Sequence, residues 1–346
     1  MRQPYGKVYV RYGDPLKLGG PTSISSDTLS PDQDEQRLEV ARMAFEVCTR
    51  IEQITPIKSA DVLSMVLLGA NQRALTAREL HAQSAQIAEL ALLRGFPVAS
   101  GFSLQNESEV SAAVLALEGA GLVRSFDRAS RPVYYIPREQ RLAAAYYRNT
   151  ITHYFLAAAL GEIGMAMCAL DIELPNADSL REHVLALRDL YKFEFFFKPA
   201  ETFWEEVLFE TSDRYHGSEG GDLSIERLLR DQPPRFGHAI LRSITEGYLI
   251  MAVTLLERGG LPVQDEKAFT RQLLDAGEHM LLRRTISCES SVSRDLFTNA
   301  LRLAAHLALL DGRGEDLARR RQAFAEQVVA ALSAINLLQR HYDETW

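Results

Sequence analysis

The pattern of apolar and polar positions separates a short β-like opening from a long helical remainder. Residues 7–12 are rich in β-forming side chains, and the Gly-Asp-Pro run at 13–15 predicts a turn. An isolated strand leaves its backbone donors and acceptors unpaired. We therefore interpret residues 1–29 as the terminal strand and loop of a truncated domain whose other strands lie outside this sequence.

A connecting helix is predicted over residues 30–56. Ser30 can cap its first turn, and Pro31 suits the first helical position because its φ angle is already helical. Apolar side chains then recur at helical spacing, and Pro56 marks the end.

Residues 57–137 have the order helix, helix, helix, hairpin. Helices are predicted over 57–69, 76–95 and 106–121, where a Thr-Ala-Arg-Glu capping box opens the second. Two β-rich runs then bracket a polar turn. This order is typical of a winged helix, so we predict a winged-helix-like segment.

Residues 138–346 are predicted to form an α-helical domain. Helical patterns cover residues 138–170, 179–197, 200–211, 235–258, 265–286, 290–311 and 314–342. The apolar stretch 151–170 contains His153 and Glu162, which favours a buried helix over a membrane span. The predicted fold class is mainly α: a leftover strand, a winged-helix-like α/β segment, then a helical bundle.

Charge argues against nucleic acid as a partner. The chain has 38 Lys and Arg against 46 Asp and Glu, a net charge of -8, whereas general nucleic-acid binders carry an excess of cations. The third helix of the winged-helix-like segment contains Glu107, Glu109 and Glu118 and no Lys or Arg. A winged-helix DNA-binding protein and a helical interaction protein therefore stand only as alternatives.

No metal, cofactor or catalytic residue is predicted. The cysteines Cys48, Cys168 and Cys288 are far apart and form no zinc-binding pattern. His306 and Asp311 match H-x-x-x-x-D, but a match of this kind is expected by chance. Because His306 lies on the polar flank of a predicted helix near its C-terminus, we interpret it as an exposed helix histidine.

A first cluster of candidate site residues comprises Arg148, Asn149 and His153 on an otherwise apolar helix. Asn149 and His153 are four residues apart and would share a helix face. Buried polar groups need hydrogen-bond partners, so we predict a structural network that docks the helical domain. An anion or substrate contact is the alternative.

A second cluster is the aromatic run at 190–198, which continues to Phe203 and Trp204. Aromatic side chains all around a helix indicate a buried core. The alternative is a face for a membrane or a partner, formed by Lys192, Phe196, Lys198 and Trp204, with lysines reaching anionic lipid.

Several blocks resemble the region that follows the catalytic motifs in bacterial membrane-bound glycerol-3-phosphate acyltransferases. The resemblance is collinear over roughly residues 4–200, and the Tyr-Tyr-Arg-Asn block with its histidine is the most specific part. It is carried by GKVYVRYGDPL at 6–16, ITPI at 54–57, RALTAREL at 73–80, REQ at 138–140, YYRN at 146–149 with His153, and KFEFF at 192–196.

The resemblance implies acyl transfer from acyl-CoA or acyl carrier protein to glycerol 3-phosphate, in phospholipid biosynthesis on the cytoplasmic side of the bacterial membrane. The family's H-x-x-x-x-D motif and phosphate-binding arginine block precede the strand with which this chain begins. We therefore expect the chain to be inactive and soluble alone, with the missing acyltransferase half as its partner, and any membrane contact to be peripheral.

Overall fold

The structure is a computed structural model that describes residues 9–16, 33–127, 131–170, 177–215 and 234–346. Its first elements are α1 (Gln33–Ile54), α2 (Ser59–Gly69), β1 (Leu75–Thr76), α3 (Ala77–Leu93), α4 (Glu107–Gly119), β2 (Arg124–Phe126), β3 (Val133–Tyr135), η1 (Arg138–Gln140) and α5 (Arg141–Asn149). Then follow η2 (Thr152–Phe155), α6 (Leu156–Leu170), α7 (Ala177–Leu190), α8 (Ala200–Tyr215), α10 (Gly237–Glu257), α11 (Glu266–Leu282), η3 (Glu289–Ser291), α12 (Arg294–His306) and α13 (Glu315–Thr345).

The predicted mainly α fold is confirmed, and α2, α3 and α4 are arranged with a small sheet as in a winged helix. The predicted capping box starts α3: Thr76 Oγ1 accepts from the Glu79 N–H at 3.2 Å, and Glu79 accepts from the Thr76 N–H at 2.7 Å. Gly95 follows α3 with φ of 66°, a left-handed angle that suits glycine at a helix end.

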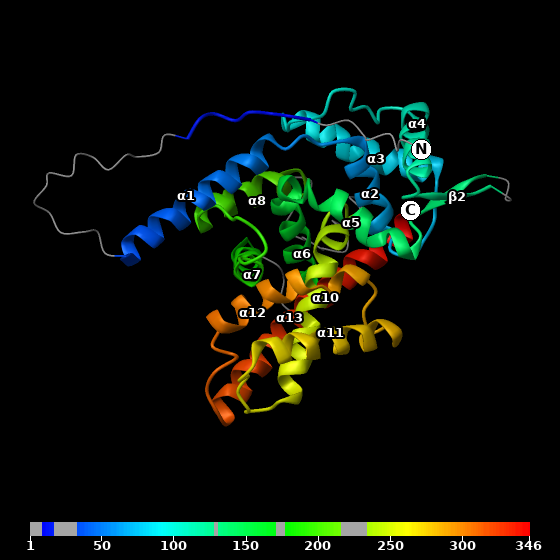
Figure 1. Cartoon of the computed structure of the whole chain (residues 1–346). Helices are drawn as coiled ribbons and strands as arrows, with labels where there is room; N and C mark the ends of the chain where they lie inside the picture. Colours follow the sequence, from blue (N-terminus) through cyan, green and yellow to red (C-terminus); the bar gives the residue numbers. More distant parts are fainter. Residues whose placement is uncertain (1–8, 17–32, 128–130, 171–176, 216–233) are drawn as a thin grey trace, which may run out of the picture.

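The sheet has three antiparallel strands in the order β1-β3-β2, and β1 is an addition to the predicted hairpin. Tyr134 of β3 lies between Leu75 of β1 and Ser125 of β2. The β2–β3 hairpin projects from the body of the molecule (Figure 1).

Helix α10 is the central element of the bundle, between α13, α6, α11 and α12 (Figure 1). Leu241, Tyr248 and Met251 on this helix are fully buried. One hydrophobic cluster joins the bundle to the winged-helix-like segment. Across that junction, Gln339 of α13 donates to the Gly69 carbonyl at 3.1 Å, and the Tyr342 hydroxyl donates to Gln83 at 2.6 Å.

Two buried carboxylates hold the ends of this bundle in place. Glu162 of α6 accepts the backbone N–H groups of Arg235, Phe236 and Gly237 at 2.8–3.0 Å. It therefore supplies acceptors to donors at the start of α10, which lack partners within the helix. Glu246 of α10 likewise accepts from backbone and hydroxyl groups of the segment 287–291.

Two helical stretches are long and apolar enough to cross a membrane, Thr152–Leu170 and Gly237–Glu257. In the structure 61% and 78% of their apolar windows are buried inside the protein. This degree of burial is typical of core helices, and it agrees with the expectation that residues 151–170 form a buried helix.

The predicted opening strand is not formed in its described residues. Residues 9–16 are irregular and mostly exposed, and Tyr12 is 93% exposed. No described strand lies beside them to pair with their backbone, so β-forming side chains alone do not make a strand. Instead, the Arg11 guanidinium donates to the Val98 carbonyl at 2.5 Å. The predicted loop at 19–31 lies outside the described residues.

Two predicted helices are shorter than expected. The helix predicted over 138–170 is broken between Asn149 and Thr152, so that η1, α5, η2 and α6 replace it. Helix α7 ends at Leu190; residues 191–195 form turns and bends, and residues 196–199 are irregular. In this segment the Glu194 carboxylate accepts hydrogen bonds from the Tyr248 hydroxyl and the Asn299 amide, which ties it to α10 and α12.

Candidate functional site

A groove of about 630 Å³ opens between α1, the turn after α3, the start of α6 and the segment leading into α8. In Figure 1, α1 and α8 lie next to each other and flank this region. Its size and mainly apolar lining are those of sites that bind small ligands.

Aromatic rings from distant parts of the chain form the walls of the groove. Phe45 of α1 meets Phe196 edge to face at 5.0 Å between ring centroids. Phe197 and Phe203 make a similar pair at 5.0 Å, and Phe96 lies 4.7 Å from Tyr154. Edge-to-face and tilted pairs of this kind are the favoured geometries, so the rings hold one another in place.

The charged groups at the groove are largely paired with one another. Arg94 forms an ion pair with Glu210, with 3.0 Å between Nε and Oε1, and its guanidinium lies 3.9 Å from the centre of the Phe209 ring. Lys198 forms an ion pair with Glu206. Glu52 is the remaining acid of the lining, and burial raises its pKa. The groove therefore carries no excess of positive charge.

His153 is the residue of the first sequence cluster that reaches the groove. Its Nε2 lies 2.9 Å from the Glu52 carbonyl, which also accepts from the Tyr154 hydroxyl at 2.8 Å. Burial lowers the pKa of His153 to about 4, so the ring is neutral at pH 7. Because a carbonyl only accepts, Nε2 carries the proton and Nδ1 is the acceptor nitrogen.

Arg148 and Asn149 lie away from the groove. The buried Arg148 guanidinium donates to the Ala239 carbonyl at 3.0 Å and to Ser243 at 3.2 Å, which joins α5 to α10. Asn149 is exposed, and its Oδ1 accepts from Arg148. The expectation that Asn149 is buried and shares a helix face with His153 is wrong, because α5 ends between them.

The second sequence cluster is divided by the structure. Phe196 and Lys198 line the groove and are exposed. Lys192 bonds to His306 at 2.8 Å instead. Trp204 is only 9% exposed and belongs to the core, so it cannot form part of a surface that contacts a membrane.

His306 and Asp311 form no site in the described structure. α12 ends at His306, before the predicted limit, and both residues are exposed. Between them Ala308 has a left-handed φ of 52°, which turns the chain out of the helix. No hydrogen bond or ion pair joins the two side chains among the described residues. No group of three His, Cys, Asp or Glu suited to a metal occurs in the same residues.

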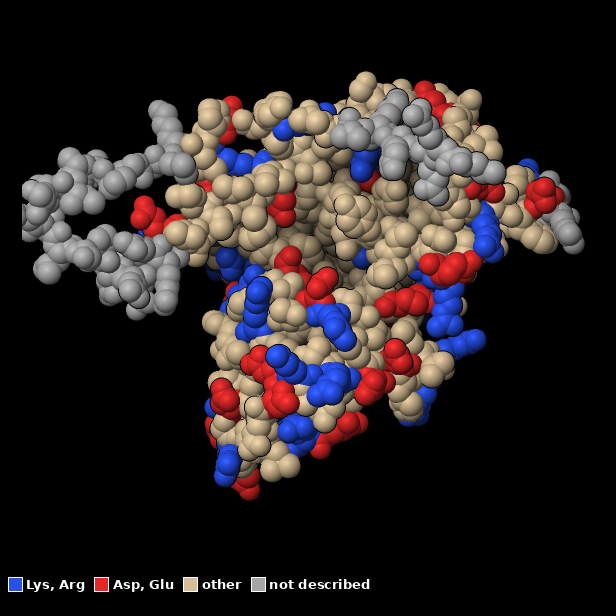
Figure 2. Space-filling model, viewed as in Figure 1, with Lys and Arg blue, Asp and Glu red and all other residues tan. Residues whose placement is uncertain are grey.

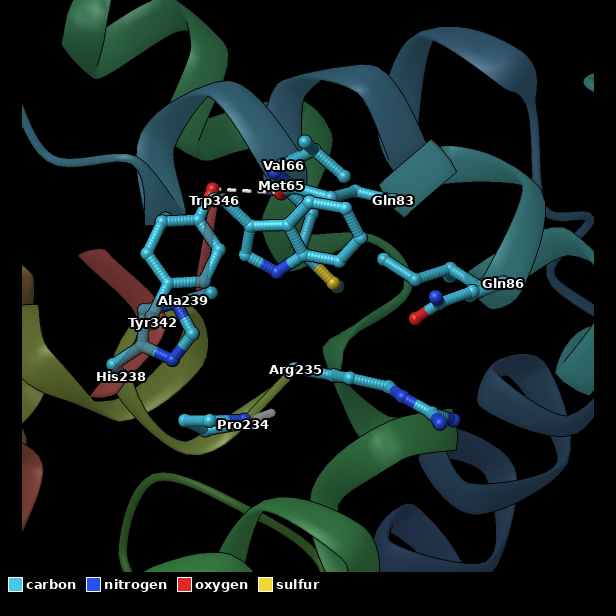
Figure 3. A pocket seen from close by; sticks show the side chains of 12 residues that line it. Met65, Val66, Gln83, Gln86, Pro234, Arg235, His238, Ala239, Tyr342 and Trp346 are labelled. Atoms are coloured by element: carbon cyan, nitrogen blue, oxygen red, sulfur yellow. Dashed lines mark hydrogen bonds between the residues drawn. The ribbon is translucent and has the colours of Figure 1, made fainter. Parts of the chain in front are cut away.

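A second, much smaller pocket lies between α2, α3, α10 and α13. Figure 3 shows the His238 imidazole beside the Tyr342 ring, whose hydroxyl reaches Gln83, with Trp346 and Arg235 across the space. The enclosed volume is about 20 Å³, room for about one water molecule. The larger aromatic groove is therefore the candidate functional site.

The face of the molecule seen in Figure 2 has two unlike regions. Figure 2 shows Lys and Arg intermingled with Asp and Glu over the lower part, where α11 and α12 lie, and a largely uncharged upper part that is hollowed near its centre. Phe209 of α8 is 60% exposed and lies against the Arg94 guanidinium, and Leu93 at the end of α3 is 77% exposed. Large exposed apolar side chains are typical of contact surfaces where they gather.

Sequence reasoning identified two parts of the groove, His153 and the aromatic run, but not that they meet. It missed Arg94 and the rings of Phe45 in α1, Phe96 in the turn after α3 and Phe209 in α8. These are isolated aromatic positions, and no local signal separates them from core residues.

Comparison with known protein families gives the class of the chain. Residues 1–313 match the model of the family described as "Glycerol-3-phosphate acyltransferase C-terminal region". The chain belongs to this family. The family resemblance found in the sequence is thereby confirmed.

Curated relatives carry acyltransferase names. The chain is 31% identical over 340 residues to the "Putative acyltransferase plsB1" of Mycobacterium tuberculosis (strain ATCC 25618 / H37Rv), which covers 96% of this chain and 54% of the relative. It is 25% identical over 296 residues to the "Glycerol-3-phosphate acyltransferase" of Pseudomonas entomophila (strain L48), covering 81% of this chain and 33% of the relative. The chain thus spans about half or less of the length of these relatives.

Proposed function

We propose that this chain takes part in acyl transfer from acyl-CoA or acyl carrier protein to glycerol 3-phosphate, a step of phospholipid biosynthesis. In this proposal it is the C-terminal region that works with an acyltransferase domain, in the same polypeptide or another. The match of residues 1–313 to the glycerol-3-phosphate acyltransferase C-terminal family carries the proposal.

The described residues support a need for that second domain. Acyl transfer to a hydroxyl requires a base that can take its proton. His153 lines the groove, but burial lowers its pKa to about 4, which makes it a weak base at neutral pH. His306 contacts Lys192 rather than an acid that could orient it.

The test is an acylation assay with labelled glycerol 3-phosphate and palmitoyl-CoA. We expect no product from the purified chain. We expect product when it is combined with the part of the M. tuberculosis relative outside the matched residues. We expect none when the H-x-x-x-x-D histidine that the family resemblance implies for that part is replaced by alanine. Turnover by the chain alone, abolished by His306→Ala, would contradict the proposal.

We further propose that the chain lies peripherally on the cytoplasmic side of the bacterial membrane. The exposed side chains of Phe196 and Phe209, which line the groove, support this proposal. Aromatic groups at headgroup depth are typical of an interfacial surface.

Flotation with phosphatidylglycerol vesicles tests this second point. Inserting an exposed phenylalanine contributes about 1.5–3 kcal/mol, so Phe196→Ser with Phe209→Ser should lower the partition coefficient more than about tenfold. Phe126→Ser, at a 50% exposed position on the β2–β3 hairpin, is the matched control. Equal flotation of the two proteins would argue against this surface.

A further inference from the structure

We propose that the aromatic groove binds one unbranched alkyl chain whose head is uncharged and carries a hydroxyl group, held by His153 Nδ1. The ligand class is a neutral single-chain lipid such as a monoacylglycerol. The choice of an alkyl chain over another apolar group rests on the proposed acyltransferase function; the preference for a neutral hydroxyl head comes from the groove itself.

The space and its walls favour an apolar ligand. The groove of about 630 Å³ has Leu156 and Ala157 beside its aromatic rings, and a site of this volume accommodates a ligand much larger than water. Phe196 is 43% exposed although it lies against Phe45. A chain laid along the rings would remove such apolar surface from water, which is favourable.

The charges of the lining disfavour an anionic head. Arg94 and Lys198 are already paired with Glu210 and Glu206, and Glu52 adds a third acid. A carboxylate or phosphate entering the groove would have to compete with the paired acids for both cations. An uncharged head avoids this repulsion and loses less hydration on binding.

His153 supplies the polar contact that selects the head group. Its Nε2–H is committed to the Glu52 carbonyl, so Nδ1 presents a lone pair. In the described structure Nδ1 has no hydrogen-bond partner. It is also not one of the fully buried atoms without a partner, so it remains open to a ligand or to water. A lone pair in this position accepts from a hydroxyl group and repels a carboxylate.

Isothermal titration of the full chain with 1-decanol, its methyl ether and decanoate tests the inference. The three share a ten-carbon chain, but only the alcohol is an uncharged hydrogen-bond donor. We expect 1-decanol to bind about fivefold more tightly than 1-methoxydecane, the worth of one neutral hydrogen bond, and decanoate to bind more weakly than the alcohol.

Variants separate the chain contact from the head contact. His153→Leu should bind the alcohol and the ether equally, whereas His153→Asn, which keeps an acceptor near the position of Nδ1, should restore the preference. Ala157→Phe fills the groove and should abolish binding of all three compounds. Ala44→Phe makes the same change at an exposed position of α1 and should bind like the wild type.

Three results would overturn the inference: no binding of 1-decanol, equal affinity for the alcohol and the ether in the wild type, or tightest binding of decanoate. Thermal unfolding of each variant shows whether it is folded. If Ala157→Phe does not fold, His153→Asn and Ala44→Phe still test the inference. The titration measures ligand binding and not acyl transfer. A negative acylation assay therefore does not affect the binding result, and a negative binding result does not affect the acylation assay.

Discussion

Among single residues, the buried Arg148 shows how one polar side chain can join two elements. It is 5% exposed, and it donates to a backbone carbonyl and a hydroxyl of α10. Burial lowers its pKa from a value far above neutral, and the guanidinium remains charged at pH 7. Its neighbour Asn149 is also polar, but its side chain is exposed to solvent.

Replacing Arg148 by alanine should destabilise the protein by about 1–3 kcal/mol, because it leaves buried acceptors on α10 without a donor. Leu142→Ala, at a 63% exposed position of the same helix, is the matched control and should change the free energy of unfolding by less than about 0.5 kcal/mol. Chemical denaturation of the two variants measures the difference. A larger effect for Leu142→Ala would show that Arg148 does not join α5 to α10 in this way.

The buried histidines should make the protein less stable in acid. The folded-state pKa values of His153 and His238 are lowered to about 4 by burial, against about 6.5 in the unfolded chain. Unfolded histidines therefore bind more protons between pH 6.5 and 4, so stability is complete above pH 6.5 and falls as the pH drops toward 4. Asp61 opposes this in part, since burial raises its pKa to about 6 and disfavours its charged form as the pH rises.

Comparing the wild type with His153→Asn isolates the contribution of His153 to this pH dependence, because asparagine does not titrate in this pH range. Between pH 7.5 and 5.0 the wild type should lose about 2 kcal/mol more stability than the variant. Denaturation midpoints at the two pH values provide the measurement. Parallel losses in the two proteins would mean that His153 is not kept neutral by the fold.

At the scale of elements, close approach between helices depends on glycine at particular positions. Gly247 lies in α10 where α12 and η3 pack, and a Cβ atom there would come 2.3 Å from Leu296 Cδ2 and 3.1 Å from the Ser291 carbonyl oxygen. A glycine inside a helix normally costs stability relative to alanine, so its presence is explained by the packing.

Gly247→Ala should therefore destabilise the protein by about 1–3 kcal/mol, the usual cost of overpacking a core. Gly119→Ala, near the end of α4 with open space around it, should be neutral or stabilise by up to about 1 kcal/mol. Thermal midpoints of the two alanine variants test the contrast. The prediction fails if both substitutions act in the same direction.

At the scale of the whole molecule, a winged-helix-like segment is packed into a larger helical body. Its α2 contacts α5 and α10, and residues near the end of α13 bond to α2 and α3. The third helix of this segment, α4, carries acids that are engaged locally: Glu109 accepts from the Gln105 N–H and Glu118 from the Ser125 N–H. Hydrogen bonds from Ser103 and Gln105 lower the pKa of Glu109, which keeps it ionised.

The protein should consequently not bind duplex DNA, despite this segment. An acidic third helix repels phosphates and lacks the arginine and lysine side chains that read bases. Titration with mixed-sequence DNA at low salt should show no sub-micromolar complex. A tight complex whose affinity falls steeply with salt would instead support the DNA-binding alternative.

The sequence by itself determined the elements whose signals are local. Capping residues and hydrophobic periodicity predicted α2, α3 and α4, and the Tyr-Tyr-Arg-Asn block pointed to the family, because neighbouring residues contain this information. The tertiary structure decided what depends on distant partners. It broke the helix after Asn149, left residues 9–12 without a partner strand, buried Trp204, and brought His153, Phe196 and Phe45 to one groove. Those outcomes are set by contacts between residues far apart in the chain, which a local pattern cannot specify.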